Sequence, residues 1–329
     1  MPRLGREGWV NFTLIALLLG LPLAANAMGE PFYVTLATRA AILALAGVGL
    51  NVALGLGGMV SFGHAAYFGL GGYAAGILAH HAANFTPVLT WPVEIAGTTS
   101  MPAIWLVAVV VAGLIAVPIG AISLRTSGVY FIMITLAFAQ MIFFLAISLP
   151  TYGGEDGLPI YLRNSFPGVN TLAPLPFFLI AYGALLVALV GFHIVRQSRF
   201  GTALQAIRQN PDRVAAIGIA PFPIRLTGLV ISAMVTALAG ALFADLNRFV
   251  GPTMLSWHTS GEILIFVILG GVGRTFGPVV GAGLFIVLEF YLGGLTQHWQ
   301  FFLGLILLAV VLYARGGVMG LLAGKARHD

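Results

Sequence analysis

The segment "PAIWLVAVVVAGLIAVPIGAIS" (102–123) contains no charged residue. An apolar stretch of about 20 residues is long enough to cross the hydrocarbon core of a bilayer as an α-helix. The whole chain has this character, with 59% hydrophobic residues, 8% charged residues and a mean hydropathy of +1.01. Soluble domains contain roughly 25% charged residues. The composition therefore predicts an all-α integral membrane protein.

Ten segments are candidates for membrane-spanning helices on the same length scale. They lie near residues 11–27, 33–54, 60–80, 102–123, 128–149, 173–192, 223–244, 258–273, 278–295 and 299–314. Cytoplasmic loops of membrane proteins carry an excess of Lys and Arg, and this bias tests the count. With a cytoplasmic N-terminus, all of the fifteen Lys and Arg fall inside except Arg39, Arg163 and Arg248. We therefore expect one polytopic bundle over residues 1–329, with both termini cytoplasmic.

The first span has two interpretations. Residues 1–27 combine a basic start, an apolar middle and the pattern Ala25-x-Ala27, which is typical of a cleaved signal peptide. A polytopic protein inserts without a cleaved leader, so we expect this segment to be a retained helix.

Motifs of soluble enzymes are missing from the sequence. There is no cysteine, no HExxH zinc motif and no GxSxG nucleophile turn. The segment most similar to a P-loop, "GLLAGKA" (320–326), lacks the required spacing and the Ser or Thr after Lys325. We expect no catalytic residue, metal or cofactor in this chain, so that any ATP and Mg²⁺ would bind to a partner. The net charge of +5 reflects orientation in the membrane rather than nucleic-acid binding.

The longest polar stretch is "RQSRFGTALQAIRQNPDRVAAIGIAPFPIR" (196–225). Its first part predicts a short amphipathic helix, with Leu204 and Ile207 on one side and Arg208 on the other. The stretch falls in a cytoplasmic loop of the predicted topology.

A second short helix is expected after Asn210-Pro211, which breaks the first one. Asp212 is placed to cap this helix, and Gly218 is placed to end it. Two interpretations remain open for the projecting element as a whole. Its arginines could hold it against anionic membrane lipid, or its surface could dock a cytoplasmic partner.

Six stretches carry a resemblance to a known family, and together they extend from about Leu50 to Gly320. They are "GLGGMVSFGHAAYFGLGGY" (55–73), "LRTSGVYFIMITLAFAQ" (124–140), "TYGGEDGL" (151–158), "ALQAIRQNPDRVAAIGI" (203–219), "ILGGVGRTFGPVVGA" (268–282) and "YARGGVMGLL" (313–322). In this order they resemble the M-type permease subunits of branched-chain amino acid ABC importers, the Liv or hydrophobic amino acid uptake systems. One departure is Arg274-Thr275, where the family pattern has Ser and a bulky residue.

The resemblance implies a permease in a bacterial inner membrane that translocates branched-chain or other hydrophobic amino acids. Its implied partners are a related second permease subunit, two cytoplasmic ABC ATPases and a periplasmic solute-binding protein. The outward turn with Glu155 and Asp156 would face the binding protein. The residues expected to couple to the ATPases are Leu204, Ile207, Arg208, Asp212, Ala215, Ala216 and Gly218.

The stretch "SFGHAAYFGLGG" (61–72) contains a histidine in an apolar, glycine-rich run. Ser61 is placed to cap the helix that follows it. The face formed by Ala65, Gly69, Gly72 and Gly76 is predicted to pack against a neighbouring helix, because small residues let backbones approach. His64 lies away from this face, where it could line a path, act as a gate or only satisfy a backbone carbonyl.

Other polar side chains at membrane depth complete the candidate substrate path, because such groups are costly there. The candidates are Ser61, His64, Tyr67, Thr135 and Gln140. Urea, short amides and aromatic acids remain alternative solutes within the same importer class. An ion-coupled secondary transporter is the alternative of another class, although Asp245, Glu262 and Glu289 lie toward helix ends rather than at mid-depth.

Overall fold

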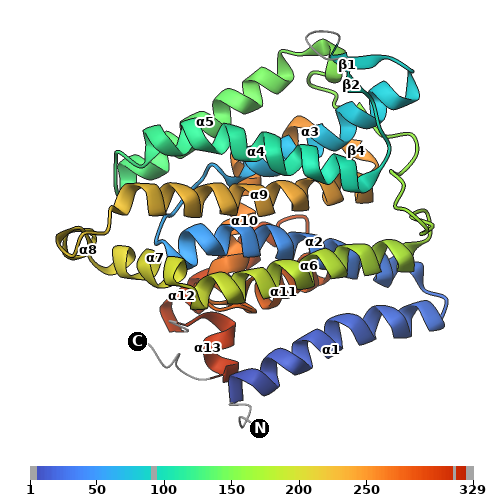
Figure 1. Cartoon of the computed structure of the whole chain (residues 1–329). Coiled ribbons are helices and arrows are strands. Elements are labelled where there is room, and N and C mark those ends of the chain that lie inside the picture. The colour runs from blue at the N-terminus through green and yellow to red at the C-terminus, as the bar shows by residue number, and fades with distance from the viewer. Residues whose placement is uncertain (1–5, 90–94, 314–315, 324–329) are drawn as a thin grey trace.

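The computed structural model describes residues 6–89, 95–313 and 316–323. These residues form a bundle of α-helices (Figure 1). The helices are α1 (Arg6–Ala27), α2 (Pro31–Asn51), α3 (His64–Ala83), α4 (Met101–Ser123), α5 (Val129–Ile147), α6 (Pro174–Gln197), α7 (Arg199–Gln209), α8 (Pro211–Ala216), α9 (Pro221–Asn247), α10 (Trp257–Gly270), α11 (Gly277–Leu295), α12 (Trp299–Tyr313) and α13 (Gly317–Ala323). The short strands β1 (Pro87–Leu89) and β2 (Ile95–Ala96) pair antiparallel, as do β3 (Leu158–Pro159) and β4 (Phe249–Val250).

Each of the ten expected spans corresponds to a helix, but the helices differ in how well they meet the requirements for crossing a bilayer. Among the described residues, seven helices are long and apolar enough: α1, α2, α4, α5, α6, α9 and α11. Helices α10 and α12 are apolar but shorter. Helix α3 has the length, but its histidines, tyrosines and glycines lower its hydropathy. The chain is therefore a multi-pass, all-α membrane protein.

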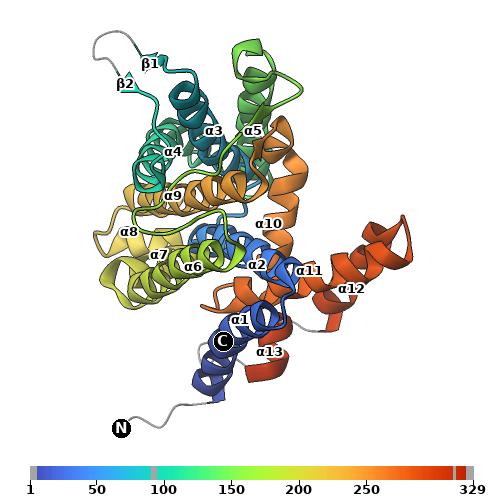
Figure 2. The same ribbon diagram turned by 90° about the vertical axis from the view of Figure 1, so that its right-hand side faces the viewer.

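The core of the bundle lies where α3, α2 and α4 pack around α9 (Figure 2). Helices α3 and α9 touch through their backbones. A Cβ atom at Gly71 would collide with the carbonyl of Ala237, and one at Gly240 would collide with the carbonyl of Phe68. Glycine is required at both positions, as is common where membrane helices approach closely.

The predicted small-residue face of α3 is covered, but not by a spanning helix. Positions corresponding to Cβ atoms of Gly69, Gly72 and Gly76 meet Leu255, Met254 and Val250, which belong to β4 and the 3₁₀ turn Pro252–Leu255. The prediction of a shared face is confirmed, but its glycines pack mainly against β4 and this short 3₁₀ helix rather than against a membrane-spanning helix. The chain between α9 and α10 folds back against α3 and takes that place.

At the end of the bundle opposite α7 and α8, the connection between α5 and α6 is fastened to the end of α9 (Figure 1). The Arg163 guanidinium donates to the carbonyls of Asp245 (3.0 Å), Leu246 (3.2 Å) and Thr171 (2.7 Å). The Asn164 amide donates to the Asp245 carboxylate at 2.6 Å. Arg163, one of the three arginines predicted to lie outside, therefore holds the connection between α5 and α6 against the end of α9.

Arg39, also predicted to lie outside, belongs to α2 and forms an ion pair with Glu289 of α11 at 3.0 Å. Because charged groups at membrane depth are costly without a partner, the two residues stabilise each other and tie α2 to α11. Arg3, Arg315, Lys325 and Arg327 of the charge argument lie outside the described residues.

Candidate functional site

The connection between α2 and α3 is irregular although it is largely buried. Helix α2 passes into a π-helical turn (Val52–Leu56), and the backbone then runs without regular structure until α3 begins at His64. Gly58 has a φ of +64°, which favours glycine. Irregular backbone at membrane depth is tolerated only where its N–H and C=O groups find partners inside the protein. We call residues 52–63 the first turn.

Side chains of other helices supply those partners. The Thr135 hydroxyl of α5 accepts the N–H of Phe62 at 3.3 Å. The Ser260 hydroxyl of α10 donates to the carbonyl of Phe62 at 2.6 Å and accepts the N–H of Ala65 at 2.8 Å. The conformation of the first turn therefore depends on where α5 and α10 lie.

Ser61 does not cap α3 as predicted, because Gly63 occupies the cap position. The Ser61 hydroxyl instead accepts the N–H of Gly63 at 3.1 Å, which stabilises the bend before the helix. The prediction missed the start of the helix because long-range bonds, not a local cap, determine where α3 begins.

His64 lies at the first helical position of α3 and is fully buried. Its Nε2 is 2.7 Å from the hydroxyl oxygen of Ser232 in α9, and that hydroxyl donates to the carbonyl of Gly49 in α2 at 2.6 Å. Because the Ser232 hydrogen is used in this way, Nε2–H of His64 is the donor in the first bond. The histidine thus links α3, α9 and α2 through the hydroxyl of Ser232.

The predicted path residues gather here to different degrees. Ser61, His64, Tyr67 and Thr135 are each at most 2% exposed, and the ring of Tyr67 lies edge-on to His64 at 5.8 Å. Gln140 lies farther along α5 and is half-buried. This conformation shields the first four from solvent, and their role in a substrate path stays a prediction.

At the opposite face of the first turn lie α7 and α8, which form the predicted projecting element (Figure 1). Leu204 and Ile207 are buried, and Leu204 packs against Gly57 and Gly228. These two residues therefore attach the element to the bundle and are not free to meet a partner.

The remaining predicted coupling residues are exposed. They are Arg208, Asp212, Ala215, Ala216 and Gly218. Asn210, not Asp212, caps α8, since its side-chain oxygen accepts the N–H of Arg213 at 3.0 Å. Because α8 begins at Pro211, Asp212 lies in its first turn, where a negative charge is favourable.

The sequence interpretation missed Ile217, which follows α8. This large apolar side chain is 73% exposed, beside Ala216 and Gly218. An apolar residue at the tip of a polar loop was the available signal. With Ala216 and Gly218 it forms a small apolar surface at the tip of the loop, which we call the apolar knob (216–218).

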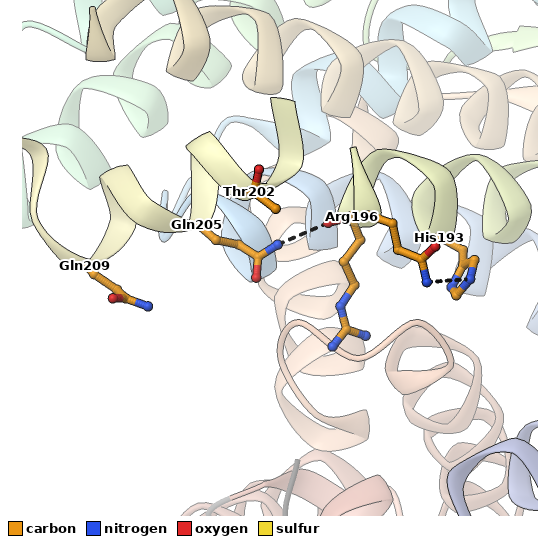
Figure 3. A pocket seen from close by; sticks show the side chains of 6 residues that line it. His193, Arg196, Thr202, Gln205 and Gln209 are labelled. Atoms are coloured by element: carbon orange, nitrogen blue, oxygen red, sulfur yellow. Dashed lines mark hydrogen bonds between the residues drawn. The ribbon is translucent and has the colours of Figure 1, made fainter. Parts of the chain in front are cut away.

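A recess of about 660 Å³ adjoins the element, between the end of α6 and α7 (Figure 3). Its lining residues are polar: His193, Arg196, Gln197, Thr202, Gln205 and Gln209. The Gln205 amide donates to the carbonyl of Arg196 at 3.4 Å, which holds α7 beside the end of α6. The polar surface beside α7 is thus hollowed rather than flat.

The sequence interpretation also missed Asn51, the last residue of α2. It is fully buried, and its amide N–H donates to the carbonyl of Arg274 at 2.9 Å while its oxygen accepts the N–H of Gly273 at 2.8 Å. Gly273 and Arg274 lie in the connection between α10 and α11 (271–276), which we call the second turn. An isolated asparagine in an apolar helix was the available signal.

Glu155 and Asp156 are exposed in the glycine-rich turn after α5, at the end of the bundle opposite α8 (Figure 1). Gly153, Gly154 and Gly157 have positive φ values of 88°, 49° and 79°, which the turn requires. The placement suits docking on the outer face, and that role stays a prediction.

Comparison with known proteins identifies relatives of this chain. The family described as "Branched-chain amino acid transport system / permease component" matches residues 32–311. The high-affinity branched-chain amino acid transport system permease protein LivM of Escherichia coli (strain K12) is 28% identical, with 93% of this chain and 74% of LivM aligned. LivM of Salmonella typhimurium is 27% identical, with 91% and 74% aligned.

A shorter match covers 49% of this chain and 49% of the autoinducer 2 import system permease protein LsrC of Escherichia coli O9:H4, at 28% identity. No solved structure matches the chain.

Proposed function

We propose, from the premise that this chain belongs to the branched-chain amino acid transport system permease family, that it translocates branched-chain or other hydrophobic amino acids across a bacterial inner membrane. The chain is a permease subunit of an ABC importer and a multi-pass membrane protein. The proposed solute is inferred from the LivM relatives, which are named as branched-chain amino acid permeases. Ten spans with both termini in the cytoplasm complete the proposal.

The observation that carries this function is the exposed tip of α8. Ala215, Ala216, Ile217 and Gly218 present small and apolar groups on a loop that buried Leu204 and Ile207 attach to the bundle. A fastened loop with an exposed knob can transmit a push from a bound partner. We therefore assign the tip to a cytoplasmic ABC ATPase, which supplies ATP and Mg²⁺.

The full assembly would contain this chain, a related second permease subunit, two ATPases and a periplasmic binding protein. The binding protein would dock at the outer turn with Glu155 and Asp156, where acidic groups can pair with basic residues of the partner. Closure of the ATPases would press on α8 and α7 and open the pathway inward. The match to LsrC indicates that related permeases serve importers of different solutes, so the binding protein is expected to select the solute.

Docking is tested by co-expression of this chain with candidate ATPases and purification through a tag on the permease. We expect Ile217→Asp to lose the co-purified ATPase, because a charge would enter an apolar contact. Ala83→Asp, at the exposed end of α3 on the opposite face, should retain it. Equal recovery of ATPase with both variants would contradict the assignment.

The substrate path is tested at His64 in proteoliposomes that contain the complete importer and its binding protein. We expect His64→Ala to slow leucine uptake while the complex remains assembled. Ser232→Ala serves as the comparison, because it removes the same hydrogen bond but keeps the imidazole. Normal uptake by His64→Ala would leave the histidine a packing role only.

A further inference from the structure

The first and second turns lie in direct backbone contact. A Cβ atom at Gly55 would lie 2.8 Å from both the nitrogen and the Cα of Gly273. No side chain separates the two turns there, so a shift of one backbone displaces the other. Asn51 adds two hydrogen bonds across the same contact, to Gly273 and Arg274.

The first turn is also bonded to the projecting element. The Arg208 guanidinium of α7 donates to the carbonyl of Gly55 at 2.6 Å, and the stem of its side chain packs beside Gly58. A charged donor makes this bond stronger than one between neutral groups. The guanidinium of Arg208 therefore points toward the first turn, although other parts of the side chain are exposed.

These contacts form one continuous line from α7 to the second turn. It runs from Arg208 to the carbonyl of Gly55, then over one helical turn to Asn51, and from Asn51 to Gly273 and Arg274. We propose that Asn51 is a positioning residue that transmits the movement of α7 from the first turn to the second, and so to α10 and α11. This inference rests on the proposed function, since it assumes that an ATPase moves α7.

The reason to assign transmission rather than packing alone lies in what Asn51 joins. Its two bonds end on backbone groups of another turn more than 200 residues away, and none ends within its own helix. Thr38, also buried in α2, bonds only the carbonyl of Val34 in its own helix. Loss of the Asn51 amide would remove one hydrogen bond from the N–H of Gly273 and one from the C=O of Arg274. The backbone hydrogen bonds of α2 itself would remain.

The first test measures solute transported per ATP hydrolysed in proteoliposomes. We expect Asn51→Leu to lower this ratio by about tenfold, a typical size for coupling between sites, while ATP hydrolysis continues. Thr38→Val is the matched control in the same helix and should keep the ratio. Arg208→Met should lower it as well, and the double variant should be no worse than the more severe single variant, because both residues act in one line. An unchanged ratio in Asn51→Leu, or independent effects that multiply in the double variant, would overturn the inference.

A second test does not require Asn51→Leu to fold. The chain has no cysteine, so Val272→Cys, on the exposed part of the second turn, gives a single labelling site. We expect ATP with vanadate to change its rate of reaction with a maleimide, and Arg208→Met to abolish that change. An ATP-independent rate in a complex that still imports leucine would refute the transmission but retain the proposed function. Absence of ATP-driven leucine uptake by the unmodified complex would refute the proposed function instead.

Discussion

The first turn contains the sequence "GGMVSFG" (57–63), and the similar sequence "GGVGRTFG" (270–277) comprises the second turn and one flanking residue on each side, yet the two turns have different structures. The second turn joins two helices that touch each other directly, and Asn51 of α2 bonds it as well. Cβ atoms at Gly270 and Gly281 would collide with the backbones of Gly277 and Phe266, so α10 and α11 pack in direct contact. The first turn instead takes several of its hydrogen bonds from side chains of α5, α7 and α10.

The difference shows that the same glycine pattern can support a rigid hairpin or a turn whose shape depends on its surroundings. A hairpin closed by backbone contacts fails when any atom is added between its helices. A turn held by separate side chains loses stability one hydrogen bond at a time. It also responds to any helix that carries one of those side chains, which suits an element beside α7.

The largest effect is expected for Gly270→Val, at the end of α10 where the second turn begins. Its side chain would run into the backbone of Gly277 and force α10 and α11 apart, at a cost of about 3 kcal/mol or more. Thermal unfolding in detergent should show a large loss of stability. Gly261→Val in the same helix has no atom within 4 Å of the added Cβ and should be tolerated. Equal stability of the two variants would mean that the hairpin is not closed by backbone contact.

Ser260→Ala should have an intermediate effect, because it removes one bond of the first turn and one bond of the adjoining start of α3. The carbonyl of Phe62 and the N–H of Ala65 lose their serine partner, which should cost about 1–3 kcal/mol. Ser148→Ala removes an exposed serine hydroxyl that bonds its own helix and provides the control. If Ser260→Ala unfolded the protein as completely as Gly270→Val, the first turn would be as rigid as the second.

Thr135→Val should have the smallest effect, since the N–H of Phe62 loses one bond of 3.3 Å while the side-chain shape is kept. We expect a cost of about 1 kcal/mol in the same unfolding measurement. Thr227→Val, where an exposed hydroxyl bonds only its own helix, is the matched control. A loss no larger than that of the control would show that the Thr135 bond does not stabilise the turn.

Much of the fold followed from local patterns. Helix positions could be predicted because hydropathy over about 20 residues decides membrane insertion. Two helix caps were misplaced: Gly63 stands where Ser61 was expected, and Asn210 stands where Asp212 was expected. Residues that can form caps were present at both helix starts. The sequence could not show which of them acts as the cap, because that depends on hydrogen bonds to neighbouring elements.

The candidate site was predictable only in part. The projecting element could be found because its polarity differs from the rest of the chain, whereas Asn51 was overlooked because its partners lie far away in sequence. Helical spacing correctly placed Gly69, Gly72 and Gly76 on one face. It could not indicate that the segment from Val250 to Leu255 covers that face.

The sequence by itself determined that this chain is a membrane protein and which segments form its helices. It also determined which loop projects and which transport family the chain resembles. All of these depend on composition, spacing and motif order, which are properties of neighbouring residues. Only the tertiary structure decided that the two glycine turns touch, that His64 binds Ser232, and that Arg208 and Asn51 lie on one line of bonds. The physical reason is that a buried polar group must find a partner, and the folded chain alone brings that partner within reach.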